Sequence, residues 1–321
     1  MSKTTFHLTT FGESHGVAVG GVIEGCPSGL KIDSQFIVDE LARRATGKTS
    51  SESQRRESDE VEFLSGLLDG VTLGTPIAFI VRNTDARSED YEALKNTFRP
   101  SHADFTYQAK YGIRDWRGGG RASARTMLPY VVAGAVAKQI LAQQGVAIHA
   151  EVLSIGGETE PSKIEKLLAQ CRAEGDTVGG IVHGSITGLP AGLGEPLDDK
   201  FQACLAKAMF TIPAVKGFEY GDGFAMAAMK GSEANDLMIV NDPSSLRAER
   251  SGARQSTVRF LSNHSGGIQG GITNGEEVFF NVAFKPIPSV GLGNRHDVCA
   301  LPRAVVIVEA MAAITAFDFM L

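Results

Sequence analysis

The chain has 321 residues, 43% hydrophobic and 21% charged, an ordinary composition for a globular protein with enough apolar material for a large core. A net charge of −6 argues against non-specific binding to nucleic acid or to an anionic membrane surface, and four scattered cysteines without CxxC spacing predict neither a metal site nor disulfides. The first ten residues lack the apolar core of a signal peptide, and no run approaches the ~18 apolar residues of a membrane span, so we expect a cytoplasmic protein.

The first half of the chain alternates apolar and amphipathic segments, which indicates an α/β protein. Residues 16–24 are apolar and β-branched and predict a buried strand. Asp33 is placed to cap a helix that ends near Arg44. The other elements predicted here are a polar loop at 45–59, strands at 61–64 and 75–81, a short helix at 103–111 and a long apolar helix after residue 125.

The second half repeats this order. Residues 184–193 match residues 21–30 in three glycines, an isoleucine, a proline and a leucine, and a predicted helix follows each segment. Further matches in the same order are 258–262 with 61–65, 271–275 with 70–74, and the apolar helix 303–320 with 125–141. We therefore predict one domain of two pseudo-symmetric β-α-β halves, about 1–148 and 149–321, that share one core with helices layered on antiparallel or mixed sheets.

Three consecutive glycines at 118–120 lie among Arg117, Arg121, Ser123 and Arg125, just before the long apolar helix. Glycine lets the backbone reach positive φ and lets a ligand approach it closely. Free N–H groups at a helix start favour a phosphate, and arginines bind phosphate oxygens in pairs. Since the stretch fits neither the Walker nor the GxGxxG pattern, it predicts an anion site and no particular reaction.

Histidine is the residue type that most readily exchanges protons near neutral pH. Four of the seven histidines lie in loops beside predicted core elements, where a rigid scaffold can place active-site groups: His15, His102, His264 and His296. A single histidine in such a loop is more often structural than catalytic, and none of them has the HExxH spacing of a zinc site. The residues alone thus predict a basic pocket for a phosphorylated substrate or a nucleotide and leave the reaction open.

These stretches together resemble the chorismate synthase family. The similar segments are TTFGESHG at 9–16, RPSHAD at 99–104 with KYG at 110–112, RGGGRASAR at 117–125, GLGEP at 192–196, GDGF at 221–224, GGIQGG at 266–271, and RHDVC at 295–299 with PRA at 302–304. They span almost the whole chain in the family's order, which makes the resemblance far more specific than any single motif.

The sequence also departs from the family's usual pattern at several positions. Ser101 stands where Gly is usual, Val298 where Pro is usual, and Ser50 where a second basic residue is usual, with Lys48 as its replacement. Pro213 stands where a polar residue often contacts the flavin. Only the five residues 290–294 separate Ser289 from Arg295, where the family carries a much longer loop.

The resemblance implies a phosphate-lyase that converts 5-enolpyruvylshikimate 3-phosphate to chorismate by anti 1,4-elimination, in the shikimate pathway of aromatic amino acid biosynthesis. It implies a need for reduced FMN although the reaction has no net redox change. It also implies a homotetramer supplied with reduced flavin by a separate source, with NADPH involved only indirectly, in flavin reduction.

The resemblance further implies roles for individual residues. His102 would protonate the flavin, His15 would assist at the leaving phosphate, and Asp297 would help the flavin N5 act as a base. Residues implied to bind substrate, phosphate or NADP are Arg44, Lys48, Arg125 and Arg295. Residues implied to bind the cofactor are Arg121, Ala122, Ser123, Pro213, Ala214, Gly270, Lys285, Pro286, Ile287, Pro288, Ser289 and Arg295.

Two other classes of protein fit the pocket residues alone. One is a phosphatase or phosphotransferase that uses the same arginines and histidines without flavin. The other is a non-catalytic protein that binds a phosphorylated ligand. The presence of His15, His102 and Asp297 counts against the binding protein, and the whole-chain resemblance favours the lyase over the phosphatase.

Overall fold

The computed structural model describes residues 5–45, 58–85, 91–92, 94–240, 258–288, 290 and 297–321. The strands are β1 His7–Gly12, β2 Ala18–Glu24, β3 Val61–Phe63, β4 Leu67–Leu68, β5 Val71–Thr72, β6 Ile77–Arg82, β7 Ala147–Ile155, β8 Gly180–Thr187, β9 Val215–Tyr220, β10 Met238–Val240, β11 Val258–Phe260, β12 Ile268–Gln269, β13 Ile272–Thr273 and β14 Val278–Phe284. The α-helices are α1 Ser34–Arg44, α2 Asp104–Tyr111, α3 Leu128–Gln143, α4 Pro161–Glu174, α5 Phe201–Thr211, α6 Gly231–Ala234 and α7 Leu301–Met320.

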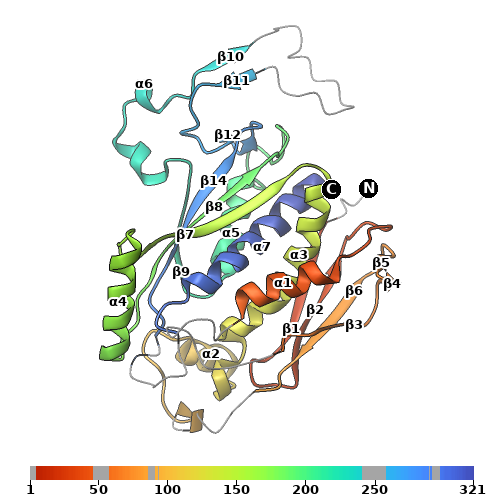
Figure 1. Ribbon diagram of the computed structural model, residues 1–321, viewed down its shortest axis with the longest axis vertical. Helices are drawn as coiled ribbons and strands as arrows, with labels where there is room; N and C mark the ends of the chain where they lie inside the picture. The colour runs from red at the N-terminus through yellow and green to blue at the C-terminus, as the bar shows by residue number, and fades with distance from the viewer. Residues whose placement is uncertain are drawn as a thin grey trace.

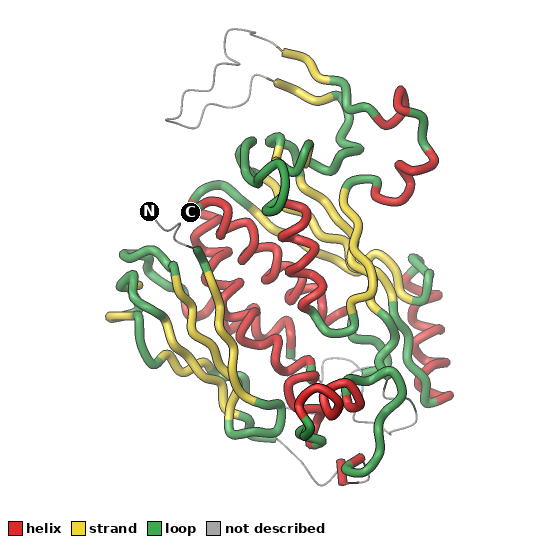
Figure 2. Tube along the Cα trace, turned by 180° about the vertical axis from the view of Figure 1, so that it is seen from behind, coloured by secondary structure: helices red, strands yellow, loops and turns green. Residues whose placement is uncertain are grey.

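Two four-stranded antiparallel sheets enclose a layer of helices (Figures 1 and 2). The first sheet has the order β1-β2-β6-β3 and the second the order β7-β8-β14-β9. Helix α3 packs on β1 and β2, α7 packs on β7 and β8, and the two helices pack on each other. Both helices are apolar on nearly all sides, as expected for helices buried between sheets.

Small residues allow α3 and α7 to approach closely. A Cβ atom on Gly134 of α3 would lie 2.4 Å from the Cβ atom of Ala310 on α7. Beside this crossing, the buried carboxylate of Glu309 accepts hydrogen bonds from Arg43 on α1 and Lys138 on α3. The helix layer is therefore held by close packing and by one buried ionic cluster.

The predicted fold class is confirmed, with every sheet pairing among the described residues antiparallel. Strand β2 and helix α1 fall where the sequence predicted them, and the carboxylate of Asp33 accepts hydrogen bonds from the N–H groups of Gln35 and Phe36 at 2.9 and 3.1 Å. Also confirmed are β3, β6, α2, α3, α5 and α7. Most of the predicted loop at 45–59 lies outside the described residues.

One predicted correspondence between the halves is wrong in its topology. Residues 258–262, matched to 61–65, contain β11, but β11 pairs with β10 in a separate two-stranded arm (Figure 1). The place beside β14 that corresponds to β3 is taken by β9, which follows α5 directly. A short sequence match reflects local turn geometry, whereas the strand that pairs with β14 depends on tertiary packing. Here β9 pairs with β14 and packs against α5. The boundary proposed near residue 148 lies at the start of β7 and stays a prediction.

No helix in the described ranges is long and apolar enough to cross a membrane.

Candidate active site

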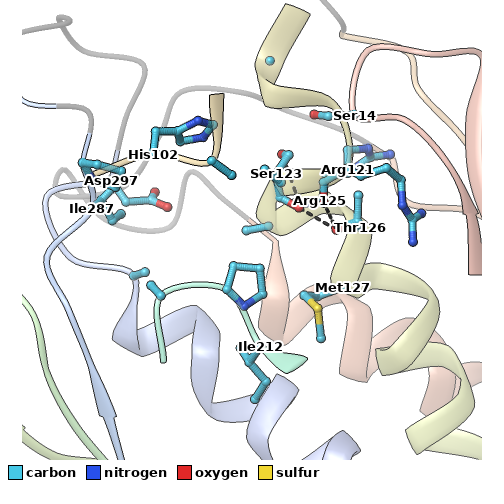
Figure 3. A pocket seen from close by; sticks show the side chains of 18 of the residues that line it. Ser14, His102, Arg121, Ser123, Arg125, Thr126, Met127, Ile212, Ile287 and Asp297 are labelled. Carbon is cyan, nitrogen blue, oxygen red and sulfur yellow. Dashed lines mark hydrogen bonds between the residues drawn. The ribbon is translucent and has the colours of Figure 1, made fainter. Parts of the chain in front are cut away.

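A cavity of about 1020 Å³ opens where the segment after β6, the start of α3, the end of α5 and the start of α7 meet. In Figure 3, His102, Asp297 and Ile287 lie on one side of it and Ser123, Arg125 and Thr126 on the other. Predicted site residues that line the cavity are Arg44, His102, Arg121, Ala122, Ser123, Arg125, Pro213, Ala214, Lys285, Ile287, Pro288 and Asp297. Predicted residues that do not line it are His15, Gly270 and Pro286, and Lys48, Ser289 and Arg295 lie outside the described residues.

The glycine turn at 118–120 brings the two predicted catalytic histidines to one loop. Its glycines have φ of 58°, 81° and 52°, the left-handed region that other residues avoid. A Cβ atom on Gly118 would lie 2.3 Å from Cδ2 of His15, and one on Gly119 would lie 3.2 Å from Cε1 of His102. His15 is buried behind the cavity lining, with its ring edge-on to Tyr91 at 5.1 Å. Gly118 and Gly119 thus leave room for the two imidazoles, and Gly120 leaves room for Glu13 and Asp115.

The three arginines of this loop face different partners. Arg117 bonds to Asp115 at 2.8 and 3.1 Å and does not line the cavity. Arg121 lines it, yet its guanidinium donates to the Gly12 carbonyl at 3.0 Å and to the Thr10 hydroxyl at 2.7 Å, which fixes the turn to β1. The turn meets the cavity at Gly118 and at residues 121–123.

Arg125 belongs to a buried ionic network that closes one corner of the cavity. Asp59 accepts hydrogen bonds from Arg125 at 2.8 Å and from Arg44 at 2.6 Å. Arg303 donates to the Arg44 carbonyl at 3.0 Å and bonds to the carboxylate of Asp297. Burial lowers the pKa of Arg44 to about 10, and the nearby Arg303 and Arg125 act in the same direction against the attraction of Asp59.

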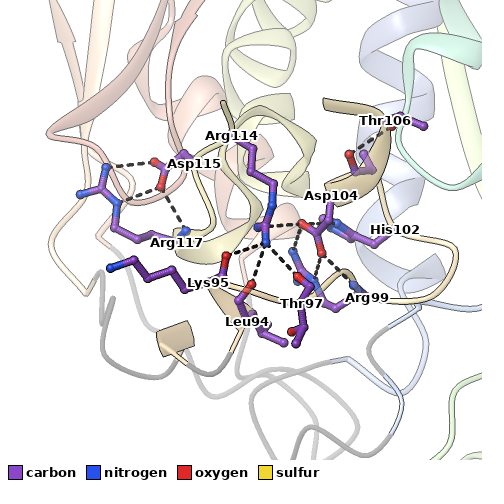
Figure 4. Close-up of polar contacts among 11 residues, drawn as sticks. Leu94, Lys95, Thr97, Arg99, His102, Asp104, Thr106, Arg114, Asp115 and Arg117 are labelled. Atoms are coloured by element: carbon purple, nitrogen blue, oxygen red, sulfur yellow. Dashed lines mark hydrogen bonds and ion pairs between the residues drawn. The ribbon is translucent and has the colours of Figure 1, made fainter. Parts of the chain in front are cut away.

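A second buried network holds His102 (Figure 4). Asp104 accepts three hydrogen bonds from Arg99, from Nε, Nη2 and the backbone N–H. Burial alone would raise the pKa of Asp104, but these bonds outweigh it and hold that pKa at about 2. Nδ1 of His102 lies 3.0 Å from Oδ1 of Asp104, and Arg114 approaches the same oxygen at 3.5 Å. Burial and the charge of Arg99 lower the pKa of His102 below its usual value, so the free protein holds a neutral imidazole at pH 7.

The cavity is basic although the protein is acidic overall. Its described lining carries six cationic residues, Arg44, Arg99, Arg121, Arg125, Lys285 and Arg303, against the two carboxylates of Asp59 and Asp297. Lys285 also joins the two halves of the chain, since its Nζ donates to the carbonyl of Ser101 at 2.9 Å. Ser101 has a φ of +57°, which explains why glycine suits this position. Such a pocket attracts a ligand with several negative charges.

The residues present also fit a flavin nucleotide. The cations of the lining supply donors for its phosphate, and an apolar wall is available for its rings: Ile212, Pro213, Ala214, Ile287 and Pro288. Within the described part of the chain, the buried Nε of Arg44 has no hydrogen-bond partner. A buried donor of this kind calls for an acceptor from a ligand.

The family model described as chorismate synthase matches residues 6–321, nearly the whole chain. The chain belongs to the chorismate synthase family. A chorismate synthase of Cytophaga hutchinsonii is 46% identical over 358 aligned positions, which cover 99% of this chain and 96% of the relative. One of Porphyromonas gingivalis is 48% identical, with 98% and 93% covered.

A crystal structure of a chorismate synthase has a TM-score of 0.79 to this chain at 29% identity, covering 99% of this chain and 92% of the other. As a member of the chorismate synthase family, the chain is a phosphate-lyase of aromatic amino acid biosynthesis. The alignment with the Cytophaga relative has 358 positions, more than the 321 residues here, so that relative has internal residues without a counterpart in this chain.

Several site residues were missed in the sequence. Asp104 and Arg99 lie in the RPSHAD motif, and Arg303 lies in the last motif. Their positions inside family-like motifs could have identified them as site residues. Asp59 had no such signal, because it is 66 residues from Arg125 and only the fold brings them together.

Proposed function

We propose that this protein converts 5-enolpyruvylshikimate 3-phosphate to chorismate and inorganic phosphate by anti 1,4-elimination, with reduced FMN bound in the cavity. The observation that carries the proposal is the basic cavity, whose lining brings together His102, Arg125 and Asp297, in a chain matched by the family over residues 6–321. The substrate brings a phosphate and two carboxylates, and the cations of the lining balance these charges.

The leaving phosphate gains negative charge as the C–O bond breaks. Arg44 and Arg125 are already fixed by Asp59, so they stabilise that charge without reorganising. His15, which packs against Gly118 of the cavity lining, would assist at the leaving phosphate.

The cofactor would be held by the backbone at 121–123, by Lys285 and by the apolar wall that includes Ala214 and Ile287. When bound, reduced FMN supplies the electron-rich ring that eases C–O cleavage. His102 would deliver a proton at the flavin, and Asp297, oriented by its bond to Arg303, would keep the flavin N5 able to accept the substrate's proton. Arg44, Arg125, Lys48 and Arg295 would bind the anions.

The remaining parts of the proposal concern location, oligomeric state and the source of reduced flavin. We propose a cytoplasmic homotetramer that receives reduced flavin from a separate source, with NADPH involved only in that reduction. Gly270 lies in the β12–β13 hairpin, at the far end of the second sheet from α2 in Figure 1. A flavin contact at Gly270 would therefore come from a neighbouring subunit of the tetramer.

The test is anaerobic release of phosphate from 5-enolpyruvylshikimate 3-phosphate, with and without chemically reduced FMN. We expect phosphate and the absorbance of chorismate to form together, and only with reduced flavin. Release without flavin would instead support a phosphatase, and binding without release would support a binding protein.

A further inference from the structure

Asp59 occupies an unusual position between two of the cavity's arginines. Its side chain is 6% exposed, and each carboxylate oxygen serves a different guanidinium: Oδ2 accepts from Arg44 and Oδ1 from Arg125. Neither arginine is more than 5% exposed in its side chain. Two buried like charges repel each other, and a shared carboxylate is what allows both to stay in one corner.

The two arginines are anchored unequally. Arg125 has three acceptors, since it also donates from Nε to the side-chain oxygen of Asn83 and from Nη2 to the Arg82 carbonyl at 3.2 Å. For the side chain of Arg44, Asp59 is the hydrogen-bond partner among the described residues, and the buried Nε of Arg44 is without one. Asp59 therefore links Arg44, which has fewer anchors, to Arg125, which has more.

The backbone at Asp59 is also constrained. Its φ is +47°, in the left-handed region, where aspartate and asparagine are tolerated better than other residues with a side chain. A strained conformation at a buried charged residue is retained where it places a group that the site needs.

We propose that Asp59 is a positioning residue, which holds Arg44 against Arg125 so that the unused donors of Arg44 bind a phosphate or carboxylate group of the ligand. The proposal deepens the proposed function, on which it rests for the identity of that ligand. It assigns the anion contact to Arg44 and the geometry of that contact to Asp59.

A different role for Asp59 would have the opposite consequence. If the carboxylate merely neutralised the arginines or competed with the ligand, its removal would strengthen anion binding, because a negative charge leaves the pocket. If it served stability alone, its removal would lower the melting temperature and leave the affinity of the folded protein unchanged.

The experiment measures binding of inorganic phosphate by calorimetry to the full chain and to Asp59→Asn. Asparagine has the same shape and accepts the same backbone conformation, so the variant should fold, which circular dichroism checks. Glu60→Gln is the matched control, because it removes one charge from the adjacent, exposed residue. We expect binding about tenfold weaker in Asp59→Asn and unchanged in Glu60→Gln, since loss of one charge-assisted bond is worth about that factor.

A double-mutant cycle with Arg44→Gln separates positioning from bulk charge. We expect Arg44→Gln to weaken phosphate binding and Asp59→Asn to add little in its background. Tighter or equal binding in Asp59→Asn, full additivity, or unchanged binding in Arg44→Gln would each overturn the proposal. None of these measurements needs turnover, so a failure of the lyase assay remains a separate result.

Discussion

Gly118 lies directly against the imidazole of His15: a Cβ atom at Gly118 would come within 2.3 Å of Cδ2 and 2.4 Å of Nε2. The side chain of His15 is buried and in edge-on contact with Tyr91, so the ring has little room to withdraw. The glycine turn therefore sets the position of His15 as well as the shape of the cavity.

The first prediction is that Gly118→Ala loses about 10²-fold in turnover, because displacing a catalytic group by about 1 Å costs that much. Gly112→Ala is the matched control: its φ is +75°, similar strain is introduced, and no atom lies within 4 Å of the added Cβ. We expect Gly112→Ala to lose roughly 1–2 kcal/mol of stability and to keep its turnover. Equal turnover in the two variants would show that the contact with His15 is unimportant.

The second prediction concerns His102 as a proton donor. We expect His102→Ala to lose about 10²–10⁴-fold in turnover, the usual cost of removing a general acid, while still binding FMN. His149→Ala, on an exposed position of β7, should match the unmodified protein in both assays. Steady-state rates and flavin fluorescence measure the two properties, and unchanged turnover in His102→Ala would contradict the assignment.

The third prediction is a titration of His102 followed by NMR. Burial and Arg99 lower its pKa below 6.5 in the free protein, and a bound phosphate should raise that pKa because an anion favours the charged imidazolium. The negative charge of Asp104 raises the pKa of His102 and so opposes burial and Arg99. Asp104→Asn should therefore lower the pKa of His102 further. An unchanged pKa of His102 in Asp104→Asn would show that the charge of Asp104 is not felt at the ring, and a higher pKa would contradict the prediction outright.

The fourth prediction concerns Glu309 and the acid stability of the helix layer. Burial raises the pKa of Glu309, but its bonds to Arg43 and Lys138 outweigh burial and hold the pKa below 4.5. Because the folded pKa is below the unfolded one, this stabilisation is present above about pH 4.5 and is lost as the pH falls through the folded pKa. Urea unfolding measured between about pH 3 and 7 would follow this loss of stability.

Glu309→Gln should destabilise the protein by about 1.5–3 kcal/mol at pH 7, because it removes charge-assisted hydrogen bonds from Arg43 and Lys138 and leaves Glu40 as their carboxylate partner. The same change at Glu165, exposed on α4, serves as the control and should be nearly neutral. A cost below about 1 kcal/mol, the range of an exposed pair, would mean that the cluster is well solvated.

The sequence predicted local features well because they depend on neighbouring residues. Asp33 caps α1 through N–H groups two and three residues away, and the apolar helices α3 and α7 follow from composition alone. The glycine turn also followed from sequence, since positive φ at three successive residues leaves glycine as the natural choice. The match of 258–262 to 61–65 was right as a strand and wrong as a sheet position, because pairing depends on distant partners.

The sequence by itself determined the family, the elements and the presence of an anion site, because spacing and residue type carry that information. Only the tertiary structure decided which arginines serve the site. Arg117 bonds to Asp115 and does not line the cavity, while Arg44 and Arg125, 81 residues apart in the sequence, line it and share Asp59. Ion pairs between residues so far apart depend on how α1, α3 and the two sheets pack. This packing is driven by burial of apolar side chains, so the sequence around each arginine does not reveal its partner.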